Sequence, residues 1–226
     1  MLKNYFKIAV RNLSRNQFHS FILFFGLSLG ITACLLLMEY VNFEWSYDRF
    51  HSKADRIYRV VNTRYQNGVL SQRGTITYPT IGPTMQKDFP EVEQYSRLTI
   101  SHNTRINFEE QSQVMDRVLF VDEHFFDLFD FKIVAGDPQK AFSESNGLAL
   151  SQSSAERLFG NQVHDLGSLL GTLVEVGSYS DPFVLHLIYE DFPDNSLLQA
   201  QALASYASTI RYWGAGADDS WEWSDF

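Results

Sequence analysis

Side chains that could bind a metal are most concentrated between residues 122 and 130. The stretch supplies four carboxylates and one imidazole, from Asp122, Glu123, His124, Asp127 and Asp130. Carboxylate oxygens and imidazole nitrogens are ligands for divalent cations, so this composition is compatible with a metal site. However, Phe125, Phe126 and Phe129 are interleaved with these residues. The pattern favours a short element with a packed apolar side and a solvated acidic side, and we predict neither a metal nor another cofactor.

A second set of acidic and basic side chains follows an apolar run near the N-terminus. Asp48, Arg49, His51 and Asp55 can donate or accept protons, but no nucleophile with an oxyanion donor accompanies them. We therefore predict a hydrogen-bonded junction between a membrane span and an outer domain. The predicted junction residues are Glu44, Tyr47, Asp48, Arg49, Phe50, His51, Arg56, Tyr58 and Arg59.

Sequence motifs of nucleotide and hydrolytic chemistry are absent. There is no GxxxxGK[ST] loop, so the chain by itself is not a P-loop ATPase, and no HExxH, GxSxG or dinucleotide-binding glycine pattern occurs. The only cysteine is Cys34, which excludes an intramolecular disulfide and a cysteine zinc site. The sequence thus predicts a protein that is not an enzyme.

The element that precedes the junction is an apolar run without a formal charge from Phe18 to Met38. A helix of this length covers roughly 30 Å, the thickness of the hydrocarbon core of a bilayer. Tyr40, Trp45 and Tyr47 follow, as is typical of the membrane–water interface. We predict a transmembrane helix over residues 18–41.

The distribution of charge predicts the orientation of this span. Residues 1–38 contain four basic residues and no acid, whereas the other 14 basic and all 27 acidic residues follow and give a balance of −13. Short basic flanks stay in the cytoplasm, so we predict a cytoplasmic N-terminus and an outer domain over residues 42–226. The acidic balance also disfavours binding to nucleic acid.

The basic residues of the first segment recur every fourth position, at Lys3, Lys7, Arg11 and Arg15. This period places them on one face of a helix. Residues 1–17 are therefore predicted to form an amphipathic helix along the inner membrane surface, with a flexible basic tail as the alternative.

Two other interpretations of the apolar run are disfavoured. A cleavable signal has a shorter apolar region and small residues at its cleavage site, whereas this run ends in LLLMEY. The tetrapeptide Ile31–Cys34 is similar to a lipobox, but four further apolar residues follow it. Within the run, Gly26, Gly30 and Ala33 form a face of small residues on which another helix can pack.

Beyond the span, short alternating segments are separated by Gly, Pro, Asn and Asp, which predicts an α+β fold. Helices are expected between Pro79 and Pro90 and from Ser151 to Gly160. Strands are expected at Ile57–Thr63, Tyr95–Ile100, Arg105–Phe108, Gln113–Val121, Phe131–Val134, Thr172–Gly177, Phe183–Tyr189 and Ala200–Ala204.

The order of these segments resembles the N-terminal part of ABC transporter permeases of the MacB/FtsX type, whose first outer region is the MacB-like periplasmic core domain. The resemblance lies in the opening MLKNYFKIAVRNLSRNQFHSFILFFGLSLGI, the juxtamembrane YVNFEWSYDRFHSKADRIYRVV, and four later segments. These are FPEVEQYSRL, VLFVDEHFFDLFDFKIVAGDPQKAF, LALSQSSAERLFG and YEDFPDNSLLQAQALAS.

The resemblance implies a subunit of the bacterial inner membrane with a two-lobed periplasmic α+β domain. A membrane-proximal lobe of about residues 45–100 and 195–226 would be interrupted by an outer lobe of about residues 101–194. The implied partners are a cytoplasmic ABC ATPase, a sister permease in a dimer, the lipid bilayer, and a periplasmic adaptor or cargo. The implied function is efflux or extraction driven by mechanotransmission, in which ATP hydrolysis moves the periplasmic domain.

Three departures from the family pattern are visible. Three further spans are absent, residues 161–171 read NQVHDLGSLLG where relatives carry a Pro-Ile-Gly-Lys-like turn, and the final YWGAGADDSWEWSDF stops where relatives continue into a strand. The membrane-proximal lobe is therefore expected to be truncated. A single-span periplasmic sensor or binding module is the alternative function, and a membrane-tethered hydrolase lacks a clustered nucleophile and base.

Overall fold

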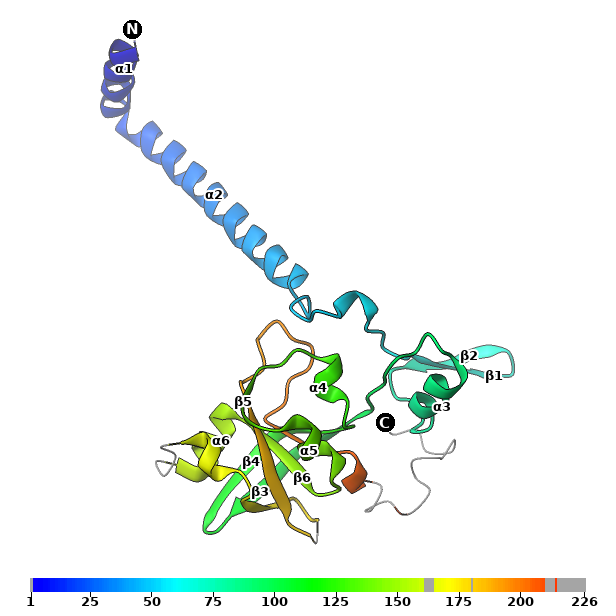
Figure 1. The fold of residues 1–226 in the computed structure, drawn as a ribbon. Helices are drawn as coiled ribbons and strands as arrows, with labels where there is room; N and C mark the ends of the chain where they lie inside the picture. Colours follow the sequence, from blue (N-terminus) through cyan, green and yellow to red (C-terminus); the bar gives the residue numbers. More distant parts are fainter. Residues whose placement is uncertain (1, 161–164, 180, 210–213, 215–226) are drawn as a thin grey trace. The chain divides into compact units, whose positions relative to one another are not determined.

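The computed structural model describes residues 2–160, 165–179, 181–209 and 214 (Figure 1). It divides into two compact units, Met1–Tyr47 and Asp48–Phe226, and each unit is described here by itself.

The first unit consists of two consecutive helices. Helix α1 covers Leu2–Arg15 and helix α2 covers Gln17–Trp45. At about 1.5 Å per residue, the 29 residues of α2 exceed the roughly 30 Å of a bilayer core. No residue of α2 is buried within the chain. Among the described residues, α2 is the one helix that is long and apolar enough to cross a membrane.

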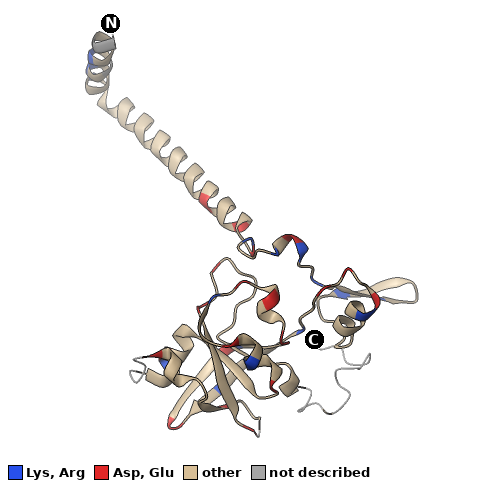
Figure 2. Cartoon of the chain, viewed as in Figure 1, with Lys and Arg blue, Asp and Glu red and all other residues tan. Residues whose placement is uncertain are grey.

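Charged residues in the first unit lie outside the apolar stretch of α2. Figure 2 shows this stretch without charge, and acidic residues appear only towards its C-terminal end. The helix continues to Trp45, one turn past residue 41, where we placed the end of the span. This added turn contains Glu44, so a polar end follows the apolar stretch within one continuous helix.

The second unit begins with a small lobe, which we define as residues 54–95. It contains the 3-10 helix η1 (Ala54–Arg56), strands β1 (Asn62–Gln66) and β2 (Val69–Gly74), and helix α3 (Ile81–Asp88). The antiparallel strands are joined by Asn67 and Gly68, which have φ angles of 53° and 78°. Two positive φ angles match the twist of a hairpin, and Asn-Gly adopts them readily.

The sheet domain, residues 96–209, is built on seven strands in the order β5-β8-β6-β9-β4-β3-β7. Their bounds are β3 Leu98–Phe108, β4 Gln111–Val121, β5 Ile133–Gly136, β6 Gly147–Ser151, β7 Leu173–Val176, β8 Phe183–Tyr189 and β9 Ala202–Ser205. The β4–β9 and β6–β8 pairs are parallel and the others are antiparallel. Strand β7 pairs with both β3 and β8, which closes six of the strands into a ring, and β5 pairs with β8 outside that ring.

Both faces of this sheet are packed. Along β4, Val118 and Phe120 belong to one buried cluster, whereas Leu119 and Val121 belong to the other, as the two-residue period of a strand requires. The short helices of the domain are α4 (Phe125–Leu128), α5 (Pro138–Ser143), α6 (Gln152–Phe159) and the 3-10 helix η3 (Leu166–Leu169). Ala155 and Leu158 of α6 lie in the first cluster, and Phe125 of α4 lies in the second.

The α+β class is confirmed, and α3 and α6 lie where helices were predicted. The strand predicted at Ile57–Thr63 is displaced, because β1 begins only at Asn62 and its pairing is fixed by the Asn67–Gly68 turn. Strands β2 and β6 and helix α5 were not predicted.

The segment 195–226, which we predicted to belong to a membrane-proximal lobe, contains strand β9. Strand β9 lies between β6 and β4, so Ala202–Ser205 belongs to the seven-stranded sheet. All four of its residues are buried there. Residues 210–213 and 215–226 lie outside the described part, and the two-lobe division stays a prediction.

Candidate functional site

Asp48 is the first residue of the predicted junction that lies in the second unit. Its backbone has a φ of 53°, and its N–H donates to the carbonyl oxygen of Asn195 at 3.0 Å. The carboxylate oxygen Oδ1 accepts hydrogen bonds from the Ser196 hydroxyl and the Leu197 N–H, both at 3.0 Å. Three hydrogen bonds thus connect Asp48 to the loop that leads into β9.

His51 is the most deeply buried residue of the junction, with 5% of its surface exposed. Its ring packs against three phenylalanines, with centroid distances of 4.1 Å to Phe50, 5.3 Å to Phe129 and 5.1 Å to Phe131. Nδ1 accepts a hydrogen bond from the backbone N–H of Asp130 at 3.0 Å. Because an accepting Nδ1 carries no proton, the neutral ring holds its proton on Nε2.

The electrostatic environment of His51 favours this neutral form. Burial lowers the pKa of the imidazole, and the charges of Asp48 and Asp130 oppose that shift without cancelling it. Within the described residues, Nε2 is buried and has no hydrogen-bond partner. The neutral ring therefore packs like an apolar side chain and forms one specific hydrogen bond, at Nδ1.

The two residues after His51 are bound to the same loop. The N–H of Ser52 donates to Oδ2 of Asp130, and hydrogen bonds from Ser52 lower the pKa of the Asp130 carboxyl. The ammonium group of Lys53 donates to the carbonyl oxygen of Asp127 at 2.6 Å. We call residues 48–53 together with residues 127–131 and 195–197 the clasp.

Not every predicted junction residue makes a side-chain contact within the clasp. Arg49 and Arg59 are exposed, and their guanidinium groups form no hydrogen bond or ion pair with another described residue. The hydroxyl of Tyr58 is 3.5 Å from the carbonyl oxygen of Asp55, and the Tyr58 side chain is 85% exposed. Arg56 forms an exposed ion pair with Glu93 in the small lobe.

Glu44 and Tyr47 belong to the first unit. Glu44 lies in the last turn of α2, and the Tyr47 ring contacts the Phe43 ring edge-on at 5.5 Å.

The acidic stretch 122–130 does not converge on one point. Asp130 faces the clasp, Asp122 is bound to Arg97, and Asp127 lies 3.0 Å from Nδ1 of His124. Among the residues that the structure describes, no group of three or more His, Cys, Asp or Glu side chains could hold a metal ion.

Sequence reasoning missed a partly buried ion pair in the sheet domain. Arg97 donates to both carboxylate oxygens of Asp122, from Nε at 2.9 Å and Nη2 at 2.7 Å, and its guanidinium lies 4.0 Å from the ring centre of Tyr206. Burial alone would lower the pKa of Arg97, but the hydrogen bonds and charge of Asp122 raise it overall. No local pattern indicates this pair, because its members are 25 residues apart.

The predicted positions on the helices are exposed. Gly26, Gly30 and Ala33 lie on the surface of α2, and a Cβ atom built on either glycine would meet no atom within 4 Å. Lys7, Arg11 and Arg15 are exposed on α1, whereas the side chain of Lys3 lies outside the described part. Among the predicted residues, only Asp48, Phe50 and His51 meet in one site, and that site anchors a chain segment.

Comparisons with known proteins give the family. Residues 20–210 match the model of the MacB-like periplasmic core domain. A domain of a proposed permease protein from Porphyromonas gingivalis is 21% identical and has a TM-score of 0.57, with 73% of this chain and 66% of that chain covered. At this identity the likeness shows the fold. A comparison with curated proteins found no match.

Two further solved structures are similar over shorter stretches. The extracellular domain of the noncanonic ABC-type transporter YknZ from Gram-positive bacteria is 15% identical, with a TM-score of 0.41 and coverage of 54% of this chain and 59% of that chain. The periplasmic region of MacB from Actinobacillus actinomycetemcomitans is 17% identical, with a TM-score of 0.41 and 56% of each chain covered. The chain thus spans less than two thirds of the length of each of the three structures.

The family match covers most of the chain and begins inside α2, and it continues through the clasp and the seven-stranded sheet. The chain therefore belongs to the family of the MacB-like periplasmic core domain, which is a domain of ABC-type transporter permeases.

Proposed function

We propose that the chain is the membrane-spanning N-terminal part of an efflux or extraction permease whose outer domain is moved mechanically by a cytoplasmic ABC ATPase. The observation that carries this proposal is the clasp. Only Ser46 and Tyr47 separate the end of α2 at Trp45 from Asp48, the first anchored residue. Because the connection is only two residues long, it can absorb little displacement. A movement of the helix end would therefore be transmitted to the sheet domain.

The proposed orientation places α1 in the cytoplasm and the second unit in the periplasm of a bacterial inner membrane. The support is the contrast between the basic α1 and the acidic chain beyond residue 38. The exposed apolar side chains of α1, including Tyr5 and Phe6, suit the inner leaflet, and Lys7, Arg11 and Arg15 suit its anionic headgroups.

The proposed partners are a cytoplasmic ATPase, a sister permease and a periplasmic adaptor or cargo. Residues 1–17 would contact the ATPase or the lipid surface. The glycines of α2 leave open space for the close approach of a second helix, which supports packing in a dimer. The family consists of permease components rather than catalytic subunits, and ATP hydrolysis is assigned to the separate ATPase.

The coupling role can be tested by measuring one distance within the chain. In a Cys34→Ala background, spin labels at Asn4→Cys on α1 and Asp116→Cys on β4 report the separation of the two units, with one labelled copy per nanodisc complex containing the ATPase. We expect different distance distributions with ATP and with ADP. Asp48→Ala, which removes the Ser196 and Leu197 hydrogen bonds but leaves the backbone bond to Asn195 and the contacts of His51, should reduce this difference while ATP is still hydrolysed.

Asp194→Ala is the matched control, because Asp194 is an exposed carboxylate in the same loop. This variant should keep the full nucleotide-dependent difference. If the Asp48→Ala variant behaves like the Asp194→Ala variant, the clasp does not transmit motion and the mechanical proposal fails.

A further inference from the structure

The small lobe contains a basic stretch within an otherwise acidic outer chain. Between residues 56 and 87 there are five basic residues and no acidic one, whereas the chain beyond residue 38 has a net charge of −13. The basic residues are Arg56, Arg59, Arg64, Arg73 and Lys87. Only Arg56 forms an ion pair with another described residue. The other four basic side chains form no ion pair among the described residues, although Asp55, Asp88, Glu91 and Glu93 in the same lobe reduce its net charge to +1.

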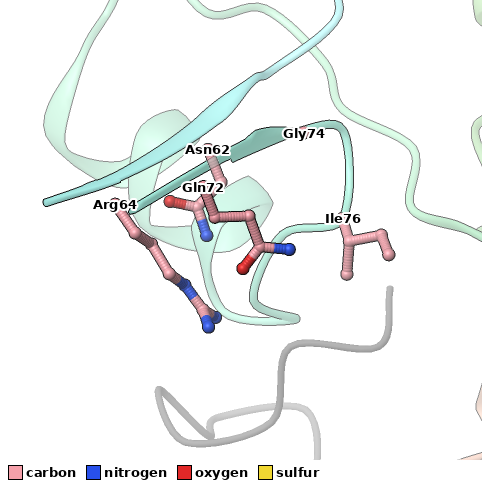
Figure 3. A pocket seen from close by; sticks show the side chains of 5 residues that line it. All are labelled: Asn62, Arg64, Gln72, Gly74 and Ile76. Atoms are coloured by element: carbon pink, nitrogen blue, oxygen red, sulfur yellow. The ribbon is translucent and has the colours of Figure 1, made fainter. Parts of the chain in front are cut away.

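One of these residues lies in a pocket on the β1–β2 hairpin. The pocket is lined by Asn62, Arg64, Gln72, Gly74 and Ile76. Arg64 is opposite Gln72 and Asn62 is opposite Gly74 in the strand register, and Figure 3 shows that the three polar side chains extend from the same face of the hairpin. The pocket thus presents one guanidinium group and two side-chain amides.

The guanidinium of Arg64 is held in place by Tyr78, but not all of its N–H groups have a hydrogen-bond acceptor. Nη2 donates to the hydroxyl of Tyr78 at 2.8 Å, and the guanidinium carbon lies 5.3 Å from the centre of the Tyr78 ring. Nε is buried and has no hydrogen-bond partner within the described residues. A buried N–H without a partner costs free energy, so a small rotation of the Arg64 side chain that brings Nε–H to a ligand oxygen at the pocket would be favoured.

We propose that this pocket binds a carboxylate of an acidic polypeptide segment. Nε–H and an adjacent Nη–H of Arg64 form the planar edge that matches the two oxygens of a carboxylate. Asn62 and Gln72 each offer a donor and an acceptor, which suit the amide groups that flank an acidic side chain in a polypeptide. A free phosphate would meet the same guanidinium edge, but it lacks the flanking amide groups with which Asn62 and Gln72 could pair in a polypeptide.

The test is a titration of the purified full chain with a fluorescein-labelled Gly-Asp-Glu-Asp-Gly peptide at 0.15 M salt, where long-range charge effects are screened. We expect the acidic peptide to bind and its Gly-Asn-Gln-Asn-Gly counterpart not to bind. Arg64→Gln should weaken binding about tenfold or more, and so should Arg64→Lys, since lysine keeps the charge but lacks the planar edge.

Arg73→Gln is the matched control, because Arg73 lies in the neighbouring strand β2, on the opposite face of the hairpin from Arg64, and is exposed. It should change affinity by no more than about twofold, as expected for a screened surface charge. The same order of peptide affinities among the wild type and these variants should be found when the acidic residues of the chain's own C-terminal stretch are replaced by their amides. These are Asp218, Asp219, Glu222 and Asp225.

Three results would overturn the proposal. Equal losses for Arg64→Gln and Arg73→Gln would show general charge attraction. Wild-type affinity in Arg64→Lys, measured on a protein whose circular dichroism and melting are unchanged, would rule out the bidentate contact. Stronger competition by inorganic phosphate than by acetate would assign the pocket to phosphate. No ATPase is needed, so the outcome is independent of the coupling experiment.

Discussion

The imidazole of His51 couples the acidity of the solvent to the stability of the clasp. Its neutral ring accepts the Asp130 N–H at Nδ1, and protonation would occupy that atom and remove the hydrogen bond. Burial lowers the pKa of His51 in the folded state below its ordinary value of 6.5. The unfolded chain therefore takes up the proton first as the pH falls. The stability that His51 contributes is present above pH 6.5 and is lost as the pH falls towards the folded-state pKa.

We predict that the free energy of unfolding of the full chain falls between pH 7.5 and pH 5.5, and that this slope is smaller in His51→Asn. Asparagine offers an acceptor oxygen near the position of Nδ1 but does not titrate in this range. Because the variant loses the packing of the ring, its stability at pH 7.5 should be lower by about 1–3 kcal/mol. Urea unfolding at each pH measures both quantities, and parallel pH slopes in the two proteins would contradict the assignment.

At the scale of residues, sequence reasoning found part of the site. Asp48 and His51 attracted notice because charged and aromatic residues follow an apolar run, and both lie in the clasp. Their partners could not be found in this way, because Asp130 and Ser196 are 79 and 148 residues away. The Arg97–Asp122 pair was missed for the same reason, although Asp122 had been considered, and disfavoured, as a candidate metal ligand.

Among the elements, the β1–β2 hairpin depends most on a single turn. Both turn residues have positive φ angles, and a Cβ atom on Gly68 would meet no neighbour within 4 Å. The cost of Gly68→Ala is therefore conformational and amounts to about 1 kcal/mol. We predict about fivefold faster hydrogen exchange for the hairpin amides and unchanged exchange in β4, since β4 belongs to a separate sheet.

Gly74→Ala provides the control for this prediction. Gly74 lies in the same hairpin and also has open space around its Cα, but its φ is not positive. Exchange in this variant should stay close to that of the wild type. Equal effects of the two substitutions would mean that the turn conformation does not determine the stability of the hairpin.

The elements that the sequence predicted are those with a strong local signal. Strand β8 was predicted at its observed bounds, Phe183–Tyr189, and α6 is bounded by the capping Ser151 and by Gly160 with a φ of 63°. Strand β6 was missed because all five of its residues are buried, so it shows no alternation of polar and apolar residues. Helix α5 has only six residues, too few for a periodic pattern.

At the scale of the whole molecule, the order of segments carried more information than any single motif. The α+β class and the family followed from that order, and both are confirmed. The placement of β9 did not follow, because parallel pairing with β4 joins residues about 80 positions apart and leaves no local trace. Burial in β9 depends on that pairing, so only the folded chain reveals it.

The orientation of the molecule in the membrane should depend on the basic face of α1. Replacing Lys3, Lys7, Arg11 and Arg15 with Glu changes the net charge of the N-terminal segment from +4 to −4. Since positive flanks are retained in the cytoplasm, we predict that the variant inverts or fails to insert.

In a Cys34→Ala background, Asp116→Cys should react with a membrane-impermeant maleimide in spheroplasts only when the natural charges are present. The variant Lys3→Arg, Lys7→Arg, Arg11→Lys and Arg15→Lys keeps the charge and should label like the parent. Equal labelling in the Glu variant would mean that the acidic domain crosses the membrane regardless of these residues, and the proposed topology would then need another physical cause.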